Sequence, residues 1–150
     1  MRFVSILIGL WLWPAVSWAQ PSPEGLWHTI DDVTGKPRGI VEIVRRGNTM
    51  IGIARGSLDP NEPVGVRCTK CTDDRRDLPL QDLEIMRGVT SKGDFWGGGE
   101  ILDPDKGKTY KVRLTVVDGG RKLEVRGYIG ISLMGRTQTW VRAPASPATP

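Results

Sequence analysis

The sequence predicts an all-β protein, a single antiparallel up-and-down barrel of eight strands. The clearest observation is the stretch 109–129, where apolar and polar residues alternate on both sides of Asp118-Gly119-Gly120. This pattern is typical of a β-hairpin with one buried face. The second observation is that other short segments of strand character follow one another between turn-forming residues, without helical periodicity after residue 19. A lone hairpin is marginal in water, and a closed barrel covers its apolar face. A β-sandwich is the alternative fold.

The first 19 residues have the pattern of a secretory signal peptide. Arg2 gives a positive start, residues 3–13 are almost wholly apolar, and Ser17 and Ala19 are small residues before Gln20. The apolar run is about 11 residues long, whereas a spanning helix needs ~20. We therefore expect cleavage between Ala19 and Gln20, export to the periplasm or outside the cell, and no integral membrane segment in the mature protein.

The mature chain has the size and charge of one domain. Removing residues 1–19 from 150 leaves 131 residues, and the net charge falls from +4 to +3 because Arg2 is the only charge removed. Basic and acidic residues are interspersed, without a long basic block, so we expect no nucleic-acid partner. The domain is expected to span 20–142. The sequence leaves open whether copies of the protein associate as a homo-oligomer.

The first three strands are separated by turn-forming residues. Residues 31–37 are dense in Asp, Thr, Gly and Pro, which favour turns. Arg46-Gly47-Asn48 forms a tight turn between the second and third strands. The expected strands of this part are 25–30, 39–45 and 49–58.

A long segment without periodicity, 59–80, follows the third strand. It contains several prolines and both cysteines, so we expect a loop. Loops longer than about 12–15 residues tend to be functional or disordered, which makes this one a candidate for a functional role.

The remaining strands follow the long loop. Gly97-Gly98-Gly99 lies inside the fifth strand, where glycine commonly marks a bulge, a sharp bend or a close approach of backbones. Residues 143–150 are expected to form a disordered tail rich in Pro and Ala. The expected strands are 83–90, 95–102, the two arms of 109–129, and 135–142.

Several motifs, which span nearly all of the mature chain, resemble one family of exported bacterial proteins, the domain of unknown function 2147 family. The resemblance implies a lipocalin-like (calycin) β-barrel and no established activity. Gly25 and Trp27 on the first strand, with Arg142 after the last, are also similar to the lipocalin pattern of a Trp packed beneath an Arg at the closed end. The motifs are Gly25-Leu26-Trp27, Asp31-Asp32, Thr34-Gly35-Lys36-Pro37-Arg38, Cys68-Thr69-Lys70-Cys71, Gly98-Gly99-Glu100-Ile101-Leu102-Asp103-Pro104, Val125-Arg126-Gly127-Tyr128-Ile129-Gly130 and Gly135-Arg136-Thr137-Gln138-Thr139-Trp140.

Cys68 and Cys71 form the most suggestive chemical motif. Haem attachment needs a following His, but residue 72 is Thr, and a zinc site needs about four ligands, but His28 is the only His. A redox dithiol is expected near a strand-to-helix turn, which the pattern does not provide. We expect a structural disulfide that pins the long loop, and a thiol redox role remains an alternative.

No other motif predicts catalysis or cofactor binding. His28 lacks a neighbouring nucleophile motif, so it is expected to be a half-exposed strand residue. The segment 103–107 lacks the ligands of a calcium loop, and Gly97-Gly98-Gly99 lacks the Lys-Ser/Thr of a phosphate loop. We therefore expect no catalytic residues, no metal and no cofactor.

The last strand carries the candidate ligand-binding residues. Arg136, Gln138 and Trp140 share one face of this strand. Because the other face is also partly polar, the alternation of residues does not show which face lies inside. If these side chains point inward, they form with Trp27 a site for a small apolar or amphipathic ligand, because an eight-stranded barrel has room for one. The leading hypothesis is a non-enzymatic binding protein. The alternative is an envelope protein-interaction or structural module with a filled barrel.

Overall fold

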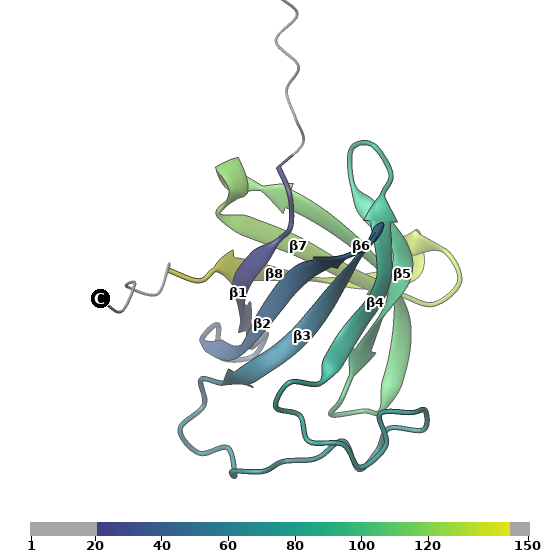
Figure 1. The fold of residues 1–150 in the computed structure, drawn as a ribbon. Coiled ribbons are helices and arrows are strands. Elements are labelled where there is room, and N and C mark those ends of the chain that lie inside the picture. The colour runs from purple at the N-terminus through teal and green to yellow at the C-terminus, as the bar shows by residue number, and fades with distance from the viewer. Residues whose placement is uncertain (1–20, 145–150) are drawn as a thin grey trace, which may run out of the picture.

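The computed structural model describes residues 21–144, which form a closed eight-stranded antiparallel β-barrel (Figure 1). Each strand pairs with the next, and the last pairs with the first at Trp27–Arg142 and His28–Val141, which closes the sheet. The strands are β1 (Gly25–Ile30), β2 (Pro37–Arg46), β3 (Thr49–Ser57), β4 (Glu84–Ser91), β5 (Trp96–Asp103), β6 (Lys108–Val117), β7 (Lys122–Tyr128) and β8 (Gly135–Arg142). The short 3-10 turns η1 (Asp118–Gly120) and η2 (Ser132–Met134) lie before β7 and β8.

The eight predicted strands are confirmed, with bounds that differ by at most two residues. The sheet is closed, so the barrel and not the sandwich is the fold. The predicted signal peptide (1–19) and most of the predicted tail (143–150) lie outside the described residues. Within the described part, no helix is long and apolar enough to cross a membrane.

The alternating side chains of the β6–β7 hairpin fill the barrel. Val112, Leu114 and Leu123 are completely buried, and Val125 is 4% exposed. The predicted inward face is therefore confirmed. Burial of each such side chain stabilises the fold by about 1.5–3 kcal/mol, so this hairpin is a major part of the core.

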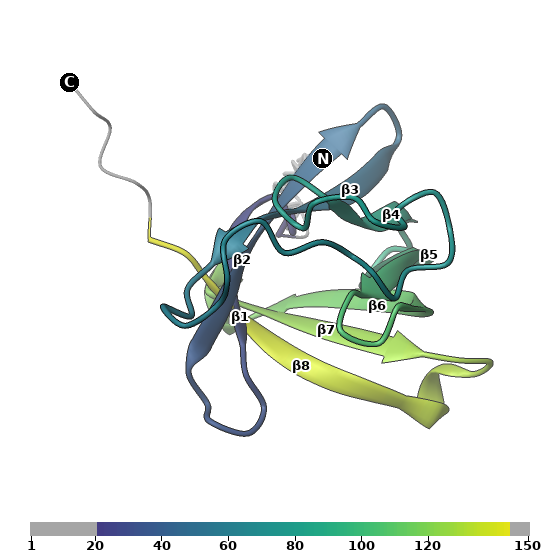
Figure 2. The same cartoon turned by 90° about the horizontal axis from the view of Figure 1, so that it is seen from below.

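Because consecutive strands run antiparallel, the connections alternate between two ends of the barrel. We call the end with residues 21–24 and the tight turns before β3, β5 and β7 the turn end. The other end carries the longer connections and is called the loop end; Figure 2 views the barrel from that side. The connections at the loop end are 31–36, 58–83, 104–107 and 129–134.

The turn end is closed by a tryptophan beneath an arginine. Trp27 is completely buried, and its Nε1 donates to the carbonyl oxygen of Pro23 at 2.8 Å. The guanidinium of Arg142 lies 4.1 Å from the centre of the Trp27 ring and donates to the carbonyl oxygens of Gly120 and Glu24. The Trp–Arg arrangement expected from the sequence is therefore present.

The long β3–β4 loop covers the outside of the barrel. Ile85 and Leu102 flank inward-facing residues, so they point outward, yet they are only 7% and 4% exposed. They belong to the same buried cluster as the two cysteines of the loop. The loop thus supplies a second layer over β4 and β5.

The three glycines of β5 form a β-bulge. The register with β6 shifts between Gly97 and Gly99, and Gly98 has a φ of 79°, which favours glycine. A Cβ on Gly99 would lie 2.2 Å from the carbonyl oxygen of Arg87. The glycines therefore permit both the bulge and the close approach of β4 that the sequence suggested.

Candidate functional site

The register of β8 settles which of its faces lies inside. Gln138 pairs with Val125 and Trp140 pairs with Leu123, and residues paired across a sheet share a face. Because Val125 and Leu123 point into the core, Gln138 and Trp140 also point inward, and so does Arg136 at the loop end of the strand. The polar row of β8 is therefore part of the barrel interior.

These inward side chains are joined to a carboxylate from the β1–β2 loop. Arg136 forms an ion pair with Asp32, and Gln138 Nε2 donates to Asp32 Oδ2 at 2.9 Å. Trp140 Nε1 lies 3.4 Å from Gln138 Oε1, a long hydrogen bond. The contacts run from the solvent-exposed rim to a buried indole. Asp32 was expected only as a turn residue, because nothing local in the sequence indicates its distant partners.

The turn that carries Asp32 is fixed by its neighbour. Asp31 Oδ1 accepts hydrogen bonds from the backbone N–H of Thr34 at 2.7 Å and of Val33 at 3.1 Å. The bond from Thr34 lowers the pKa of Asp31. The backbone N–H of Asp31 also donates to the carbonyl oxygen of Lys36, which closes the loop. The position of Asp32 is therefore set by the hydrogen bonds of its own turn.

The interior becomes more accessible toward the loop end. On β6, Val112 is completely buried, while Tyr110, the next inward residue toward the loop end, is half-buried. Its partner on β5, Ile101, is also half-buried. On β8, Trp140 is 2% exposed and the Arg136 side chain is 61% exposed. Solvent therefore reaches inward-facing side chains from this end.

Trp27 lies at the opposite end of the barrel from Arg136. It pairs with Arg142, six residues along β8 from Arg136, which corresponds to about 20 Å at the rise of a strand. The structure thus joins three of the predicted residues in one row along β8, from Arg136 at the loop end through Gln138 to Trp140, which lies two residues from Arg142.

A third tryptophan, Trp96, has an indole N–H in the interior without a hydrogen-bond partner among the described residues. Trp96 pairs with Leu114 and is 9% exposed, and its Nε1 is buried without a hydrogen-bond partner in the described part of the chain. The guanidinium of Arg45 lies 5.8 Å from the centre of its ring and is paired with Glu24 at 3.2 Å. Trp96 was not identified as a candidate residue from the sequence.

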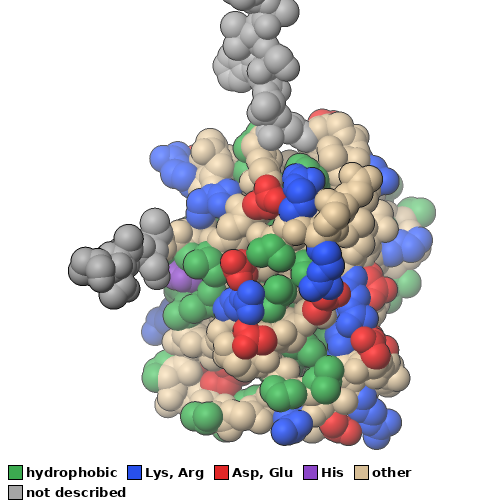
Figure 3. Space-filling view, in the orientation of Figure 1, with side chains coloured by type: hydrophobic (Ala, Val, Ile, Leu, Met, Phe, Trp, Pro, Cys, Tyr) green, Lys and Arg blue, Asp and Glu red, His purple; other side chains and the backbone are tan. Residues whose placement is uncertain are grey.

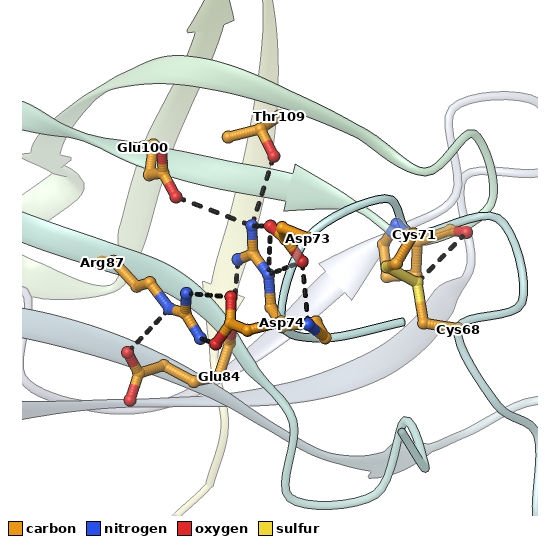
Figure 4. Close-up of polar contacts among 10 residues, drawn as sticks. Cys68, Cys71, Asp73, Asp74, Glu84, Arg87, Glu100 and Thr109 are labelled. Atoms are coloured by element: carbon orange, nitrogen blue, oxygen red, sulfur yellow. Dashed lines mark hydrogen bonds and ion pairs between the residues drawn. A yellow bond between two sulfur atoms is a disulfide. The ribbon is translucent and has the colours of Figure 1, made fainter. Parts of the chain in front are cut away.

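The long loop is anchored by a buried arginine. Arg75 is completely buried, forms an ion pair with Asp73, and donates to the Glu84 carbonyl oxygen and to Thr109 Oγ1, both at 3.2 Å. Figure 4 shows Asp73 from the loop, Glu100 from β5 and Thr109 from β6 pointing toward the same guanidinium, that of Arg75. The hydrogen bonds from Arg75 lower the pKa of Asp73 to about 2.

A neighbouring ion pair fastens the same loop to β4. Arg87 binds both carboxylate oxygens of Asp74 at 2.8 Å, and the hydrogen bond lowers the pKa of Asp74. Arg87 also contacts Glu84 at 3.0 Å. Bidentate pairs of this kind fix geometry as well as charge, so the loop has a defined position on the barrel.

The predicted disulfide between Cys68 and Cys71 is present, with Cα atoms 5.4 Å apart. Both residues are 1% exposed, and Cys68 Sγ lies 3.9 Å from the carbonyl oxygen of Pro104. Exchange with another thiol requires access to a sulfur atom. The burial therefore favours a structural role over redox chemistry.

Two open hollows lie at the surface. One, of about 420 Å³, lies over the bulge between Arg87 and Lys111, and the other, of about 360 Å³, lies between the long loop and Asp105. Among residues 21–144, no group of three His, Cys, Asp or Glu residues is placed to hold a metal ion. His28 pairs with Ile40 on β2 and is half-buried, as expected for a strand residue.

Comparison with solved structures shows the structural class of this barrel. The chain is similar to protein HP1028 from the human pathogen Helicobacter pylori, which is described as a member of the lipocalin family. The TM-score is 0.70 at 21% identity, over 81% of this chain and 83% of that one. The likeness shows the fold, a lipocalin-like β-barrel.

The chain belongs to the family described as uncharacterized protein conserved in bacteria, DUF2147, whose model matches residues 25–142. The match includes all eight strands and confirms the resemblance seen in the sequence. A comparison with curated proteins found no match.

Proposed function

We propose that this protein is an exported, non-enzymatic binding protein that holds a small apolar or amphipathic molecule at the loop end of its barrel. The observation that carries the proposal is the accessibility of inward-facing side chains at that end. Tyr110 and Ile101 offer apolar surface there, beside the polar groups of Arg136 and Gln138. A mainly apolar site with a few polar groups is the usual composition of a small-molecule site. Export is expected from the leader pattern of residues 1–19.

The apolar part of the ligand supplies most of the affinity in this proposal. Arg136 is already paired with Asp32, so an anionic head group exchanges one exposed ion pair for another, and Arg136 adds at most about 1 kcal/mol, or about fivefold in affinity. Each buried methylene contributes about 0.8 kcal/mol, which corresponds to a factor of about four in affinity. The tail is expected to lie against Tyr110, Ile101 and the edge of Trp140.

The experiment is a titration of the chain from Gln20 onward with saturated fatty acids of increasing length. Residues 25–142 contain all eight strands, so this chain retains the complete barrel. Tryptophan fluorescence should change on binding, and the affinity should rise about fourfold per methylene until the site is full. Arg136→Ala and Gln138→Ala should weaken binding, whereas Arg121→Ala, at the turn end and 77% exposed, should not.

The variant Trp140→Phe tests whether Trp140 produces the fluorescence change without being required for binding. The substitution should reduce the fluorescence change while calorimetry still detects binding. Failure of every fatty acid to bind would overturn the proposal. Binding that is unchanged in Arg136→Ala and Gln138→Ala would place the ligand elsewhere on the molecule.

A protein-interaction or structural role in the cell envelope is the second candidate. The observation that favours it is the tight filling of the turn-end half, where Trp27, Met50 and Leu114 are completely buried. If no small molecule binds in the titration and native mass spectrometry finds none bound to the purified protein, this candidate takes precedence. A thiol redox role is the least favoured, because Cys68 and Cys71 are both buried.

A further inference from the structure

The loop between β7 and β8 exposes four large apolar side chains. Ile129, Ile131, Leu133 and Met134 are 67%, 63%, 84% and 77% exposed, and they lie within six consecutive residues. Scattered apolar residues on a surface need no explanation, but a contiguous exposed group marks a site of interaction. These residues do not belong to the rim formed by Asp32 and the inward face of β8.

The loop is held in this outward conformation by an arginine. Arg126 Nε donates to the carbonyl oxygen of Ser132 at 2.6 Å, and its Nη2 donates to that of Leu133 at 3.2 Å. Its Nη1 donates to Thr137 Oγ1 at 2.8 Å. At the base of the loop, a Cβ on Gly135 would lie 2.6 Å from the carbonyl oxygen of Gly127, so the backbones there are in close contact. The apolar side chains are therefore presented by a fixed support.

Basic side chains lie beside the loop on the outer face of the barrel. Lys111 pairs with Tyr128, and Arg113 pairs with Arg126, so these cations form one group at the base of the loop. Lys111 is exposed, and Arg113 lies over the ring of Phe95. Nearby carboxylates are Glu100, paired with Lys111 across the sheet, Glu124, two residues from Arg126 on the outer face of β7, and Asp32, bound to Arg136. The local charge is positive. In Figure 3, hydrophobic side chains and Lys or Arg side chains adjoin at the edge where Figure 1 places this loop.

We propose that the β7–β8 loop docks the protein on an anionic phospholipid bilayer. The four apolar side chains enter the interfacial region, and Lys111 and Arg113 face the lipid phosphates, while Arg126 holds the loop and adds its positive charge at the base. This combination of an apolar surface and flanking cations is the one that binds anionic membranes. The loop is the tip of a hairpin that extends beyond the neighbouring strands (Figure 2). A second copy is disfavoured as the occupant, because four aliphatic side chains on a tip fall well short of the ~800 Å² per partner of a stable interface.

The test is co-sedimentation of the chain from Gln20 onward with lipid vesicles. Omitting residues 1–19 is necessary because their apolar run would itself bind lipid. One set of vesicles contains phosphatidylcholine alone, and the other contains equal parts of phosphatidylcholine and phosphatidylglycerol. The double variant Ile131→Ser/Leu133→Ser should bind the anionic vesicles at least about tenfold more weakly, since it removes most of two aliphatic side chains from the lipid contact.

A matched control removes two apolar side chains from other loops. Val33 and Val64 are 93% and 104% exposed, so Val33→Ser/Val64→Ser should leave vesicle binding unchanged. Lys111→Gln should weaken binding to the anionic vesicles about fivefold, the effect of about 1 kcal/mol for one cation near the surface. All the substituted residues are exposed, so circular dichroism should report an unchanged fold.

Three outcomes would overturn the proposal. The first is the absence of binding to the anionic vesicles. The second concerns specificity: either Ile131→Ser/Leu133→Ser binds the anionic vesicles as well as the wild type does, or the wild type binds vesicles of phosphatidylcholine alone equally well. The third is a dimer in sedimentation velocity that only this double variant dissociates, because the loop would then bind a second copy.

Discussion

Arg75 offers the sharpest test of how the long loop is held. Replacing it with Met removes the guanidinium and keeps most of the aliphatic length, so the loss reports mainly on polar contacts. Three hydrogen-bond acceptors lose their donor, namely the Asp73 carboxylate, the Glu84 carbonyl oxygen and Thr109 Oγ1. Glu100 also loses an ion pair, at 3.6 Å. Arg76, the next residue, is the matched control, because its side chain is 67% exposed and forms one ion pair within residues 21–144, with Asp77 at 3.7 Å.

The expected loss of stability follows from the burial of the two partners. Breaking a fully buried ion pair costs about 3–5 kcal/mol, because the remaining charge is left without compensation. Here the remaining carboxylates, Asp73 and Glu100, are 37% and 46% exposed and can be hydrated, so we expect the lower limit, about 3 kcal/mol. For a domain of this size, that corresponds to a fall of about 10 °C in Tm. Arg76→Met should cost no more than about 0.5 kcal/mol.

The pH dependence of stability gives a second signature. The pKa of Asp73 is about 2 in the fold and 3.8 ordinarily. A group whose pKa is lowered on folding stabilises the protein above its ordinary pKa and loses that contribution as the pH falls through the folded value. The difference amounts to about 2.5 kcal/mol without screening, and exposure of the carboxylate reduces it to about 1 kcal/mol. Wild type and Arg75→Met should therefore converge partly between about pH 4 and pH 2.

Urea unfolding of wild type, Arg75→Met and Arg76→Met across this pH range measures both effects. Equal losses for the two variants would refute the anchoring role of Arg75. A gap between wild type and Arg75→Met that does not narrow on acidification would refute the assignment of the pair to Asp73.

Further variants test the core, the disulfide and the close contact between β4 and β5. Leu114→Ala should cost about 2–5 kcal/mol, because it leaves a cavity, whereas Lys111→Ala should cost at most about 0.5 kcal/mol; equal small losses in urea unfolding would mean that the register is wrong. Replacing Cys68 and Cys71 together with Ser should cost at most about 2 kcal/mol and leave the barrel folded by circular dichroism; dithiol oxidase activity of the wild type would contradict a structural role. Gly99→Ala should cost about 1–3 kcal/mol, because its Cβ would meet a carbonyl oxygen of β4; an unchanged Tm would contradict the close approach of β4 to β5.

The strands could be predicted because each carries its own evidence. Alternation places Val112 and Leu114 on one face whatever the rest of the chain does, and glycine or proline marks each turn. Strand β8 lacked this evidence, because both of its faces are partly polar. Its orientation depends on the register with β7, where Gln138 pairs with Val125, and that pairing is not local information.

The cover formed by the long loop was missed, although the strands beneath it contain a signal. Ile85-Met86 and Ile101-Leu102 place two apolar residues in succession, whereas a strand with one solvent face alternates. Consecutive apolar pairs on neighbouring strands indicate that both faces of the sheet are covered. The role of Arg75 could not be predicted in the same way, because a buried arginine is defined by partners such as Thr109, 34 residues away.

The two arginines of β8 differ in what a ligand can do to their partners. Arg142 donates to backbone carbonyl oxygens, which the fold fixes and no solute can displace without moving the chain. Arg136 is held by Asp32, a carboxylate at the exposed rim, so another anion can take that place at little cost. Gln138 contacts both Asp32 and the indole N–H of Trp140. Displacement of Asp32 would therefore change the polar environment of a buried tryptophan through a single side chain, which makes Trp140 the residue best placed to report events at the rim.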